Sequence, residues 1–329
     1  MDCLNIFNEI SNTLELGVLV EPVNSVSGGY KHKMYYMKTT GGMYAIKLLD
    51  PTFMKMERSL VELAEAEEIE CILEKTNIPI VPALIFNEQK MQRINGQYYY
   101  IFNWVVGKIL TPEEVNDGHC KTIGTILAKI HKINKFNTPK TISYVKSNWD
   151  NYILLSSKKC QEISNMLYDN KELLYNIQEK ANIAINSLPP ISAISHSDLK
   201  FNNIIWEGKN PWIIDLEALC YENPYVGLFR LAMQWSGYLC GNHKANIKLL
   251  KVFLQAYIKE YSEFEVDWEI LYDSNLSMIE WLEYCIKSVL TDTNDVNNGK
   301  SIKKIRQPIE SLVYYDSIKQ EVLAELNTL

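Results

Sequence analysis

The sequence has no long apolar run, no paired-cysteine motif and no basic cluster. A helix needs about 20 consecutive apolar residues to span a membrane, so no membrane partner is expected. The seven cysteines are scattered and none forms a C-x-x-C pair. This pattern argues against a zinc site or a disulfide framework and indicates reduced thiols in a cytoplasm. The first residues also lack the basic and apolar segments of a signal peptide, so a cytoplasmic protein is expected.

Basic residues are fewer than acidic ones. Lys and Arg number 33 against 40 Asp and Glu, which gives a formal net charge of −7. Because binding to a phosphate backbone requires a basic surface, nucleic acid is not expected as a partner. The 47% apolar content of the 329 residues is sufficient for the cores of one large or two modest domains.

Three short strands are predicted near the N-terminus, at residues 18–23, 34–38 and 43–49, joined by glycine-containing segments. Consecutive strands without an intervening helix indicate an antiparallel meander and not a βαβ unit. This order argues against a dinucleotide-binding fold and against a Walker-type P-loop, whose lysine follows its glycines directly and opens a helix. Two further strands, at 79–86 and 98–104, complete a predicted five-stranded sheet.

Two features of this sheet suit a phosphate group. Ser27, Gly28 and Gly29 form a turn whose backbone N–H groups can approach an anion closely. Lys47 lies on the apolar face of the third strand, where an ammonium needs either a phosphate or a carboxylate from the next helix. That helix is predicted over residues 57–74 and is rich in glutamate. The alternative is an ordinary hairpin turn and a lysine on an exposed sheet face.

A second constellation lies in the middle of the chain, where two short apolar, β-branched runs flank a breaker-rich turn and predict a hairpin. If Trp206 pairs with Trp212, the register places Asn203 opposite Asp215. A carboxamide beside a carboxylate suits Mg²⁺, which takes one or two protein oxygens together with phosphate and water. Asp198, on the loop before the hairpin, is placed to accept a proton from a hydroxyl, as phosphoryl transfer requires. The alternative is that these residues only cap turns.

These residues carry a resemblance to the aminoglycoside phosphotransferase and choline kinase-like family. Its H-G/S/N-D-x-x-x-x-N signature is similar to His196-Ser197-Asp198-Leu199-Lys200-Phe201-Asn202-Asn203, and its I-D-W/F-E element is similar to Ile214-Asp215-Leu216-Glu217. The resemblance implies an α+β, bilobal, protein-kinase-like fold. A small N-terminal antiparallel β-sheet lobe with one main helix would cover residues 1–103, and a larger, mostly α-helical C-terminal lobe 104–329. The hinge would lie at about 102–107.

The resemblance also implies roles for individual residues. Asp198 would be the catalytic base, and Asn203 with Asp215 would hold Mg²⁺. A glutamate of the helix after Lys47 would pair with that lysine, and spacing favours Glu67 over its rivals Glu68 and Glu70. The contacts to ATP or GTP would then come from the glycine turn over the phosphates, the lysine with its glutamate, and backbone groups of the hinge: Ser27, Gly28, Gly29, Lys47, Glu67, Asn103 and Val105.

The last hundred residues are predicted to be helical and are rich in aromatic and acidic residues. By resemblance they would wall the acceptor site, where Glu280, Trp281 and Glu283 would suit a cationic small molecule. The sequence departs from the family at Gly227, where relatives commonly have an aspartate that braces the catalytic loop.

The predicted function is that of a small-molecule kinase, acting as a monomer or homodimer, which transfers the γ-phosphoryl group of ATP or GTP to a hydroxyl of an aminoglycoside-type antibiotic. Alternative acceptors are choline, ethanolamine, homoserine or a thiosugar. An alternative of another class is a nucleotide-binding regulatory or spore-coat-type protein with little turnover, which only Gly227 favours.

Overall fold

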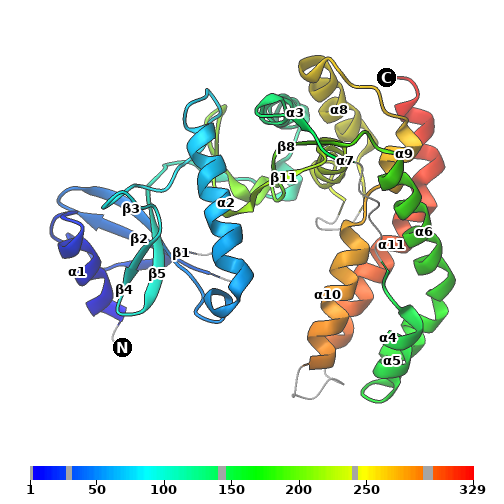
Figure 1. The fold of residues 1–329 in the computed structure, drawn as a ribbon, viewed down its shortest axis with the longest axis horizontal. Helices are drawn as coiled ribbons and strands as arrows, with labels where there is room; N and C mark the ends of the chain where they lie inside the picture. Colours follow the sequence, from blue (N-terminus) through cyan, green and yellow to red (C-terminus); the bar gives the residue numbers. More distant parts are fainter. Residues whose placement is uncertain (1–2, 27–31, 140–145, 239–243, 292–298) are drawn as a thin grey trace. The chain divides into compact units, whose positions relative to one another are not determined.

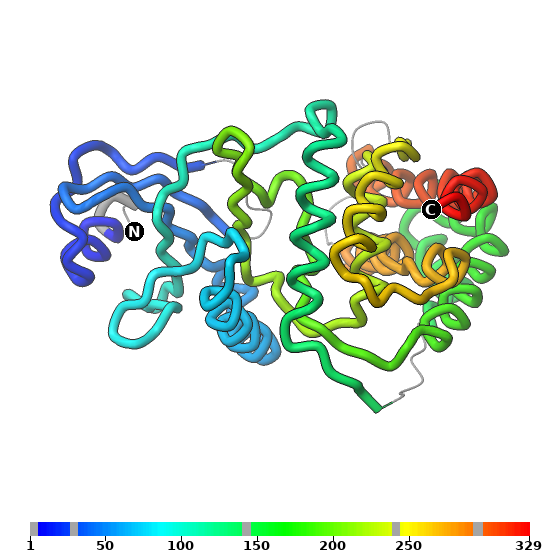
Figure 2. Tube along the Cα trace, turned by 90° about the horizontal axis from the view of Figure 1, so that it is seen from above, coloured from blue at the N-terminus to red at the C-terminus, as the bar shows by residue number. Residues whose placement is uncertain are grey.

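The computed structural model describes residues 3–26, 32–139, 146–238, 244–291 and 299–329. Figures 1 and 2 show the course of the backbone. Contacts divide the chain into two compact units, Met1–Glu114 with His196–Cys220, and Val115–Ser195 with Tyr221–Leu329. Within the described ranges, no helix combines the length and the apolar character needed to cross a membrane.

A five-stranded antiparallel sheet forms the body of the first unit (Figure 1). Its strand order is β1-β2-β3-β5-β4. An antiparallel meander of three consecutive strands is therefore confirmed, although its first strand lies at Asn24–Val26 and not at 18–23. The strands are β1 (Asn24–Val26), β2 (Lys33–Thr39), β3 (Gly42–Leu48), β4 (Gln92–Ile94) and β5 (Gln97–Asn103).

One helix lies on each face of this sheet (Figure 1). Successive side chains of a strand point to opposite faces. Tyr99 accordingly packs into the core beneath α1 (Cys3–Thr13), whereas Tyr100 packs beside Leu63 of α2 (Glu57–Leu73). The face that carries Tyr100 therefore also faces the glutamate-rich helix α2.

The predicted strand at residues 79–86 is wrong. The segment makes only isolated bridges, because Pro79 and Pro82 have no N–H to donate to a ladder. The N–H groups that remain go to separate acceptors, as when Ala83 N donates to the Glu70 carboxylate and Leu84 N to the Ile101 carbonyl. The fifth strand of the sheet is β4 instead.

The predicted strand at 18–23 is also wrong. Leu19 makes a single bridge to Thr39, and Pro22, which has no N–H to donate, lies between that bridge and β1. Regular pairing with β2 therefore begins only at Asn24, which lies opposite Tyr36.

The first unit also contains a hairpin from the middle of the chain. Its strands β9 (Ile204–Glu207) and β10 (Asn210–Ile213) form a small sheet with β6 (Lys108–Ile109). Ile213 N donates to the Pro79 carbonyl and Val81 N donates to the Ile213 carbonyl, both at 2.8 Å. These bonds attach the hairpin to the N-terminal segment, so the first unit is not contiguous in sequence. The domains 1–103 and 104–329 stay a prediction.

The second unit is mostly helical. Its strand β8 (Ile191–His196) lies between β7 (Phe136–Asn137) and β11 (Leu219–Glu222) in a small sheet, and β8 leads the chain into the first unit. The predicted mixture of a sheet-based part and a helical part is confirmed. The helices are α3 (Asp117–Lys132), α4 (Trp149–Ser157), α5 (Gln161–Asp169), α6 (Lys171–Ser187), α7 (Pro224–Trp235), α8 (Ile247–Tyr261), α9 (Trp268–Asp273), α10 (Ser277–Thr291) and α11 (Gly299–Leu326).

Gly107 provides a test of the hairpin's attachment to the first unit. A Cβ at this position would lie 2.5 Å from the Ile205 side chain and 2.7 Å from the Trp206 carbonyl. Gly107→Ala should therefore lower the free energy of unfolding in urea by about 1–3 kcal/mol through overpacking. The control is Gly299→Ala, which has no described residue within 4 Å of the added Cβ and should be neutral or stabilising by up to about 1 kcal/mol. Equal stabilities of the two variants would contradict this account of the β6–β9 contact.

Candidate active site

The hairpin has a different register from the predicted one. Trp206 lies opposite Pro211 and Ile204 opposite Ile213, so the predicted pairing of Trp206 with Trp212 is wrong by one residue. The strands close at Glu207 and Asn210, and the loop between them is only two residues long because Gly208 takes a left-handed conformation with φ of 61°. The tighter loop moves every pair along the hairpin.

As a result, Asn203 lies opposite Ile214 and not opposite Asp215. Ile214 N donates to the Asn203 carbonyl at 3.0 Å, and Asp215 follows with φ of 65° and ψ of 45°. The left-handed region is uncommon for a residue other than glycine and recurs at functional sites. The Asp215 carboxylate is therefore positioned by this local conformation and not by strand pairing.

Asp198 and Asn203 are in direct contact. The Asn203 Nδ2 donates to both the carbonyl and the Oδ2 of Asp198 at 2.9 Å, and Lys200 Nζ lies 2.9 Å from Oδ1. The Asp198 side chain is 36% exposed, so a solute can reach the carboxylate. In the part of the chain that the structure describes, the hydrogen bonds of the Asn203 side chain use Nδ2 only, which leaves its Oδ1 for a cation.

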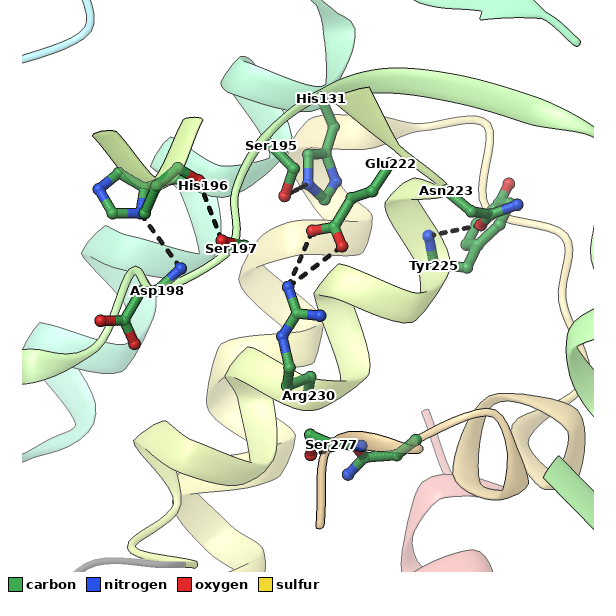
Figure 3. A network of polar contacts seen from close by, with 12 residues as sticks. His131, Ser195, His196, Ser197, Asp198, Glu222, Asn223, Tyr225, Arg230 and Ser277 are labelled. Carbon is green, nitrogen blue, oxygen red and sulfur yellow. Dashed lines mark hydrogen bonds and ion pairs between the residues drawn. The ribbon is translucent and has the colours of Figure 1, made fainter. Parts of the chain in front are cut away.

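His196 connects the Asp198 loop to the segment that carries Asp215. Its Nδ1 accepts from Asp198 N at 3.3 Å, as Figure 3 shows, and its Nε2 donates to the Ile214 carbonyl at 3.2 Å. Complete burial lowers the pKa of His196, and its two hydrogen bonds fit the neutral ring with a proton on Nε2. Ser197 adds a second link, because its backbone N and its Oγ both donate to the Ala218 carbonyl.

Lys47 meets this segment from the sheet. Its ammonium forms ion pairs with Asp215 and, at 2.6 Å, with Glu217, and the residue is only 7% exposed. Burial alone would lower the pKa of Lys47, but the charges of Glu217 and Asp215 outweigh it and raise the pKa above its usual value. The predicted placement of Lys47 on an inward sheet face with anions beside it is what the structure shows.

Glu217 is also held by His32, which the sequence did not single out. His32 Nδ1 accepts from Asp50 N at 3.0 Å, so Nε2 carries the proton and points to Glu217 Oε1 at 3.3 Å. Burial would raise the pKa of Glu217, but the His32 hydrogen bond and the Lys47 charge hold it well below its usual range. No sequence pattern indicated His32, a single histidine directly before β2.

The predicted pairing of Lys47 with a glutamate of α2 differs from what the structure shows. Glu67 accepts a 2.7 Å hydrogen bond from the hydroxyl of Tyr100, which lies directly opposite Lys47 in the β3–β5 ladder. Glu70 is bound to Lys90 at 2.5 Å and Glu68 is exposed. The physical reason is that Asp215 and Glu217 already form ion pairs with the Lys47 ammonium. The Glu67 carboxylate instead accepts its hydrogen bond from Tyr100.

Glu67 and Lys47 nevertheless line the same small cavity of the first unit. That cavity combines a cation and three carboxylates with apolar walls: Lys47, Leu63, Ala66, Glu67, Glu70, Ala83, Tyr100, Phe102, Leu216 and Glu217. It lies on the sheet face that is turned toward α2.

The other predicted nucleotide contacts stay predictions. Asn103 is the exposed last residue of β5, and Val105 follows it outside the sheet. Ser27, Gly28 and Gly29 lie outside the described residues.

The predicted acceptor residues lie on α10 in the second unit. Glu283 accepts a 2.6 Å hydrogen bond from the Tyr152 hydroxyl and lies 3.1 Å from Lys287. Trp281 stacks on Tyr284 with ring centroids 5.4 Å apart, and both rings are partly exposed. Glu280 is exposed on the same helix, so two acidic residues and two aromatic faces occur on one element.

Asn203 and Asp215 fit a magnesium ion that is bound together with phosphate. Both offer oxygen atoms, and the Asp215 side chain is 32% exposed. Across the described residues, no group of three or more His, Cys, Asp or Glu side chains is arranged to hold a metal. Mg²⁺ typically uses one or two protein oxygens and completes its shell with phosphate and water.

The chain is similar to known phosphotransferases in sequence and in fold. Residues 22–268 match the sequence profile described as the phosphotransferase enzyme family. A homoserine kinase of Granulibacter bethesdensis is 24% identical over 208 residues, which are 60% of this chain and 61% of the kinase. The chain thus covers less than two thirds of that relative's length.

Solved structures agree on the fold. Spectinomycin phosphotransferase in complex with ADP and spectinomycin has a TM-score of 0.67 at 14% identity, covering 95% of this chain and 98% of that one. For an amicoumacin kinase in complex with AMP-PNP and Ca²⁺ the values are 0.64, 12%, 96% and 94%. For choline kinase of Cryptosporidium parvum they are 0.60, 16%, 98% and 98%. The predicted kinase-like α+β fold is confirmed.

His131 in the second unit gives a pH-dependent prediction. The ring is fully buried, bonded to the Tyr257 hydroxyl at 2.8 Å and to Ser195 Oγ at 3.3 Å. Burial, with the charge of Arg230, lowers the pKa of His131 from 6.5 to about 3. The unfolded chain therefore binds a proton that the folded chain does not, so this stability is present above pH 6.5 and is lost as the pH falls toward about 3.

Urea unfolding of the wild type and His131→Gln at about pH 7 and about pH 5 should show the difference. The wild type should lose about 2 kcal/mol more than the variant between the two conditions. The buried His196 is present in both proteins, so its own titration cancels. Equal losses would mean that His131 is protonated in the folded protein.

Proposed function

The chain belongs to the phosphotransferase enzyme family, and we propose that it transfers the γ-phosphoryl group of ATP or GTP to a hydroxyl of a small molecule. One observation supports this most strongly. Lys47 and Asp215 are far apart in sequence and yet form an ion pair within one compact unit. In the same unit, Asn203 is hydrogen-bonded to Asp198. A buried cation, two oxygen ligands and a reachable carboxylate are the groups that this chemistry requires.

In this proposal Asp198 is the base. Its carboxylate is held by Asn203 and Lys200 and remains partly exposed. The acceptor hydroxyl gives its proton to that carboxylate as its oxygen forms a bond to the γ-phosphorus. The bond from that phosphorus to the oxygen bridging the β-phosphate breaks, and the nucleoside diphosphate leaves. The protein contributes mainly position and charge.

Lys47 would bind the α- and β-phosphates. Its ammonium already sits among anions, and Glu217 with His32 keeps it at the segment that carries Asp215. Asn203 Oδ1 and Asp215 would hold Mg²⁺, which when bound offsets the negative charge of the phosphates. Relatives bound to ADP, or to AMP-PNP with Ca²⁺, support a nucleotide with a divalent cation. We assign the nucleotide cover to Ser27, Gly28 and Gly29, with Glu67 beside Lys47 and the base near Asn103 and Val105.

For the acceptor, we propose an aminoglycoside-type antibiotic first, because spectinomycin and amicoumacin are named in relatives that match nearly the whole chain. Choline, ethanolamine, homoserine or a thiosugar come second, and homoserine and choline kinases are among the relatives. We assign a cationic acceptor to Glu280, Trp281 and Glu283. A panel of antibiotics and metabolites, assayed for release of ADP or GDP, tests the proposal. No release with any acceptor would favour the nucleotide-binding protein with little turnover.

Asp198→Asn tests the base. The variant should lose about 100-fold or more in turnover, since a positioned base typically contributes that much, while its affinity for ATP stays nearly unchanged. The control is Asp150→Asn, which should keep the wild-type rate. Asp150 is an exposed residue of α4, and its carboxylate lies 2.8 Å from the Lys171 ammonium. Wild-type turnover in Asp198→Asn with every accepted substrate would show that the base is another group.

Removal of the metal tests the assigned ligands. EDTA should abolish release of ADP, and added Mg²⁺ should restore it. Asn203→Leu has no side-chain oxygen, so the Mg²⁺ concentration for half-maximal rate should rise by about tenfold or more. Release that is insensitive to EDTA, or a variant with an unchanged Mg²⁺ requirement, would be evidence against this metal site.

A further inference from the structure

The carboxylate of Glu222 occupies the place that a side chain at position 227 would take. A Cβ on Gly227 would lie 2.5 Å from Glu222 Oε1 and 3.1 Å from Ser195 Oγ. The backbone of Gly227 is not left-handed, so glycine is required here for space and not for conformation. The helix α7, the strand β8 and the end of β11 therefore meet at this point within the second unit.

Arg230 holds the Glu222 carboxylate in this place. It lies on the same helix as Gly227, and its Nη2 reaches the two carboxylate oxygens at 2.9 and 3.2 Å (Figure 3). Both side chains are mostly buried, with 17% exposure for Arg230 and 19% for Glu222. A largely buried pair is weak evidence for added stability, because desolvation of two charges offsets their attraction. The role of such a pair is better sought in the neighbouring groups that it holds in place.

The Glu222–Arg230 pair lies next to the end of β8. Ser195 is hydrogen-bonded to His131 of α3 and lies against Gly227 of α7, as Figure 3 shows for His131. Ser195 is followed in the chain by His196, whose ring accepts from the backbone of Asp198. The position of β8 thus sets where the loop that carries Asp198 begins.

We propose that Glu222, held by Arg230, is a positioning residue that supports the end of β8 and through it the Asp198 loop, in place of a side chain on α7. This inference rests on the proposed function for its kinetic part. It also explains why position 227 is a glycine, since the Glu222 carboxylate fills the space that a side chain there would need. A carboxylate from either position should therefore support the end of β8.

The experiment moves the carboxylate from β11 to α7 in the full-length chain. Glu222→Ala removes it, Gly227→Ala pushes it out, and the double variant Glu222→Ala with Gly227→Asp restores one from the other side. The control is Asp273→Asn, since Asp273 pairs with Lys319 at 2.8 Å and the two side chains are 17% and 10% exposed. It breaks a similarly buried ion pair away from these elements.

Two readouts are needed for each variant. The first is kcat and the KM for ATP with the best acceptor of the panel, and the second is hydrogen exchange of a peptide covering residues 196–203. Both single variants should lower kcat by about tenfold or more with little change in KM, because a misplaced group costs rate more than binding. Both should also speed exchange of the peptide, and the double variant should recover most of both losses.

The outcomes separate this inference from the proposed function. If no acceptor is phosphorylated by the wild type, the proposed function fails, and the exchange measurement alone decides the inference. If the single variants do not fold, recovery of a folded chain and of slow exchange in the double variant still supports it. Single variants that match Asp273→Asn in both readouts, or a folded double variant that recovers neither, would overturn it.

Discussion

A buried ammonium is the constraint on which the first unit depends. Lys47 has little access to water, so the chain must supply negative charge around it, and Asp215 and Glu217 supply it from a segment far along the sequence. The hairpin β9–β10, attached to the residues around Pro79 and Val81, delivers that segment. The same arrangement places the Asp215 carboxylate, turned by its left-handed backbone, beside the cation of the sheet.

The sequence predicts the parts of this site that repeat a pattern and misses those set by local geometry. Strand alternation correctly places Lys47 on an inward face. Asp198 and Asn203 meet because only four residues lie between them. The hairpin register was wrong because a two-residue loop at Gly208 replaced a five-residue one, and a single position moves every pair. The strand at 79–86 failed because two prolines spread its hydrogen bonds among separate partners. Two residues of the site could not be found from the sequence. His32 is a single histidine outside any motif, and the role of Tyr100 depends on its position opposite Lys47 in the sheet.

In the second unit, Gly227 and Glu222 are explained together. The Glu222 carboxylate fills the space where a side chain at position 227 would lie, and Arg230 holds it there. The family resemblance predicts an aspartate at position 227, and we propose that the Glu222 carboxylate takes its place. The sequence does not reveal that Glu222 and Gly227 depend on each other, because their spacing matches no helix or strand period. Only the structure brings the two positions together.

The central claim is that Lys47, with Asp215, marks the phosphate end of a nucleotide site. Calorimetric titration with a non-hydrolysable ATP analogue, with and without Mg²⁺, tests this most directly, because it requires no acceptor. The account predicts that the wild type binds the analogue more tightly with Mg²⁺. Lys47→Met should weaken binding by about tenfold or more, and Asp215→Leu, which has no side-chain oxygen, should lose most of the affinity that Mg²⁺ adds. Unchanged affinity in Lys47→Met, or no binding by the wild type under either condition, would contradict it.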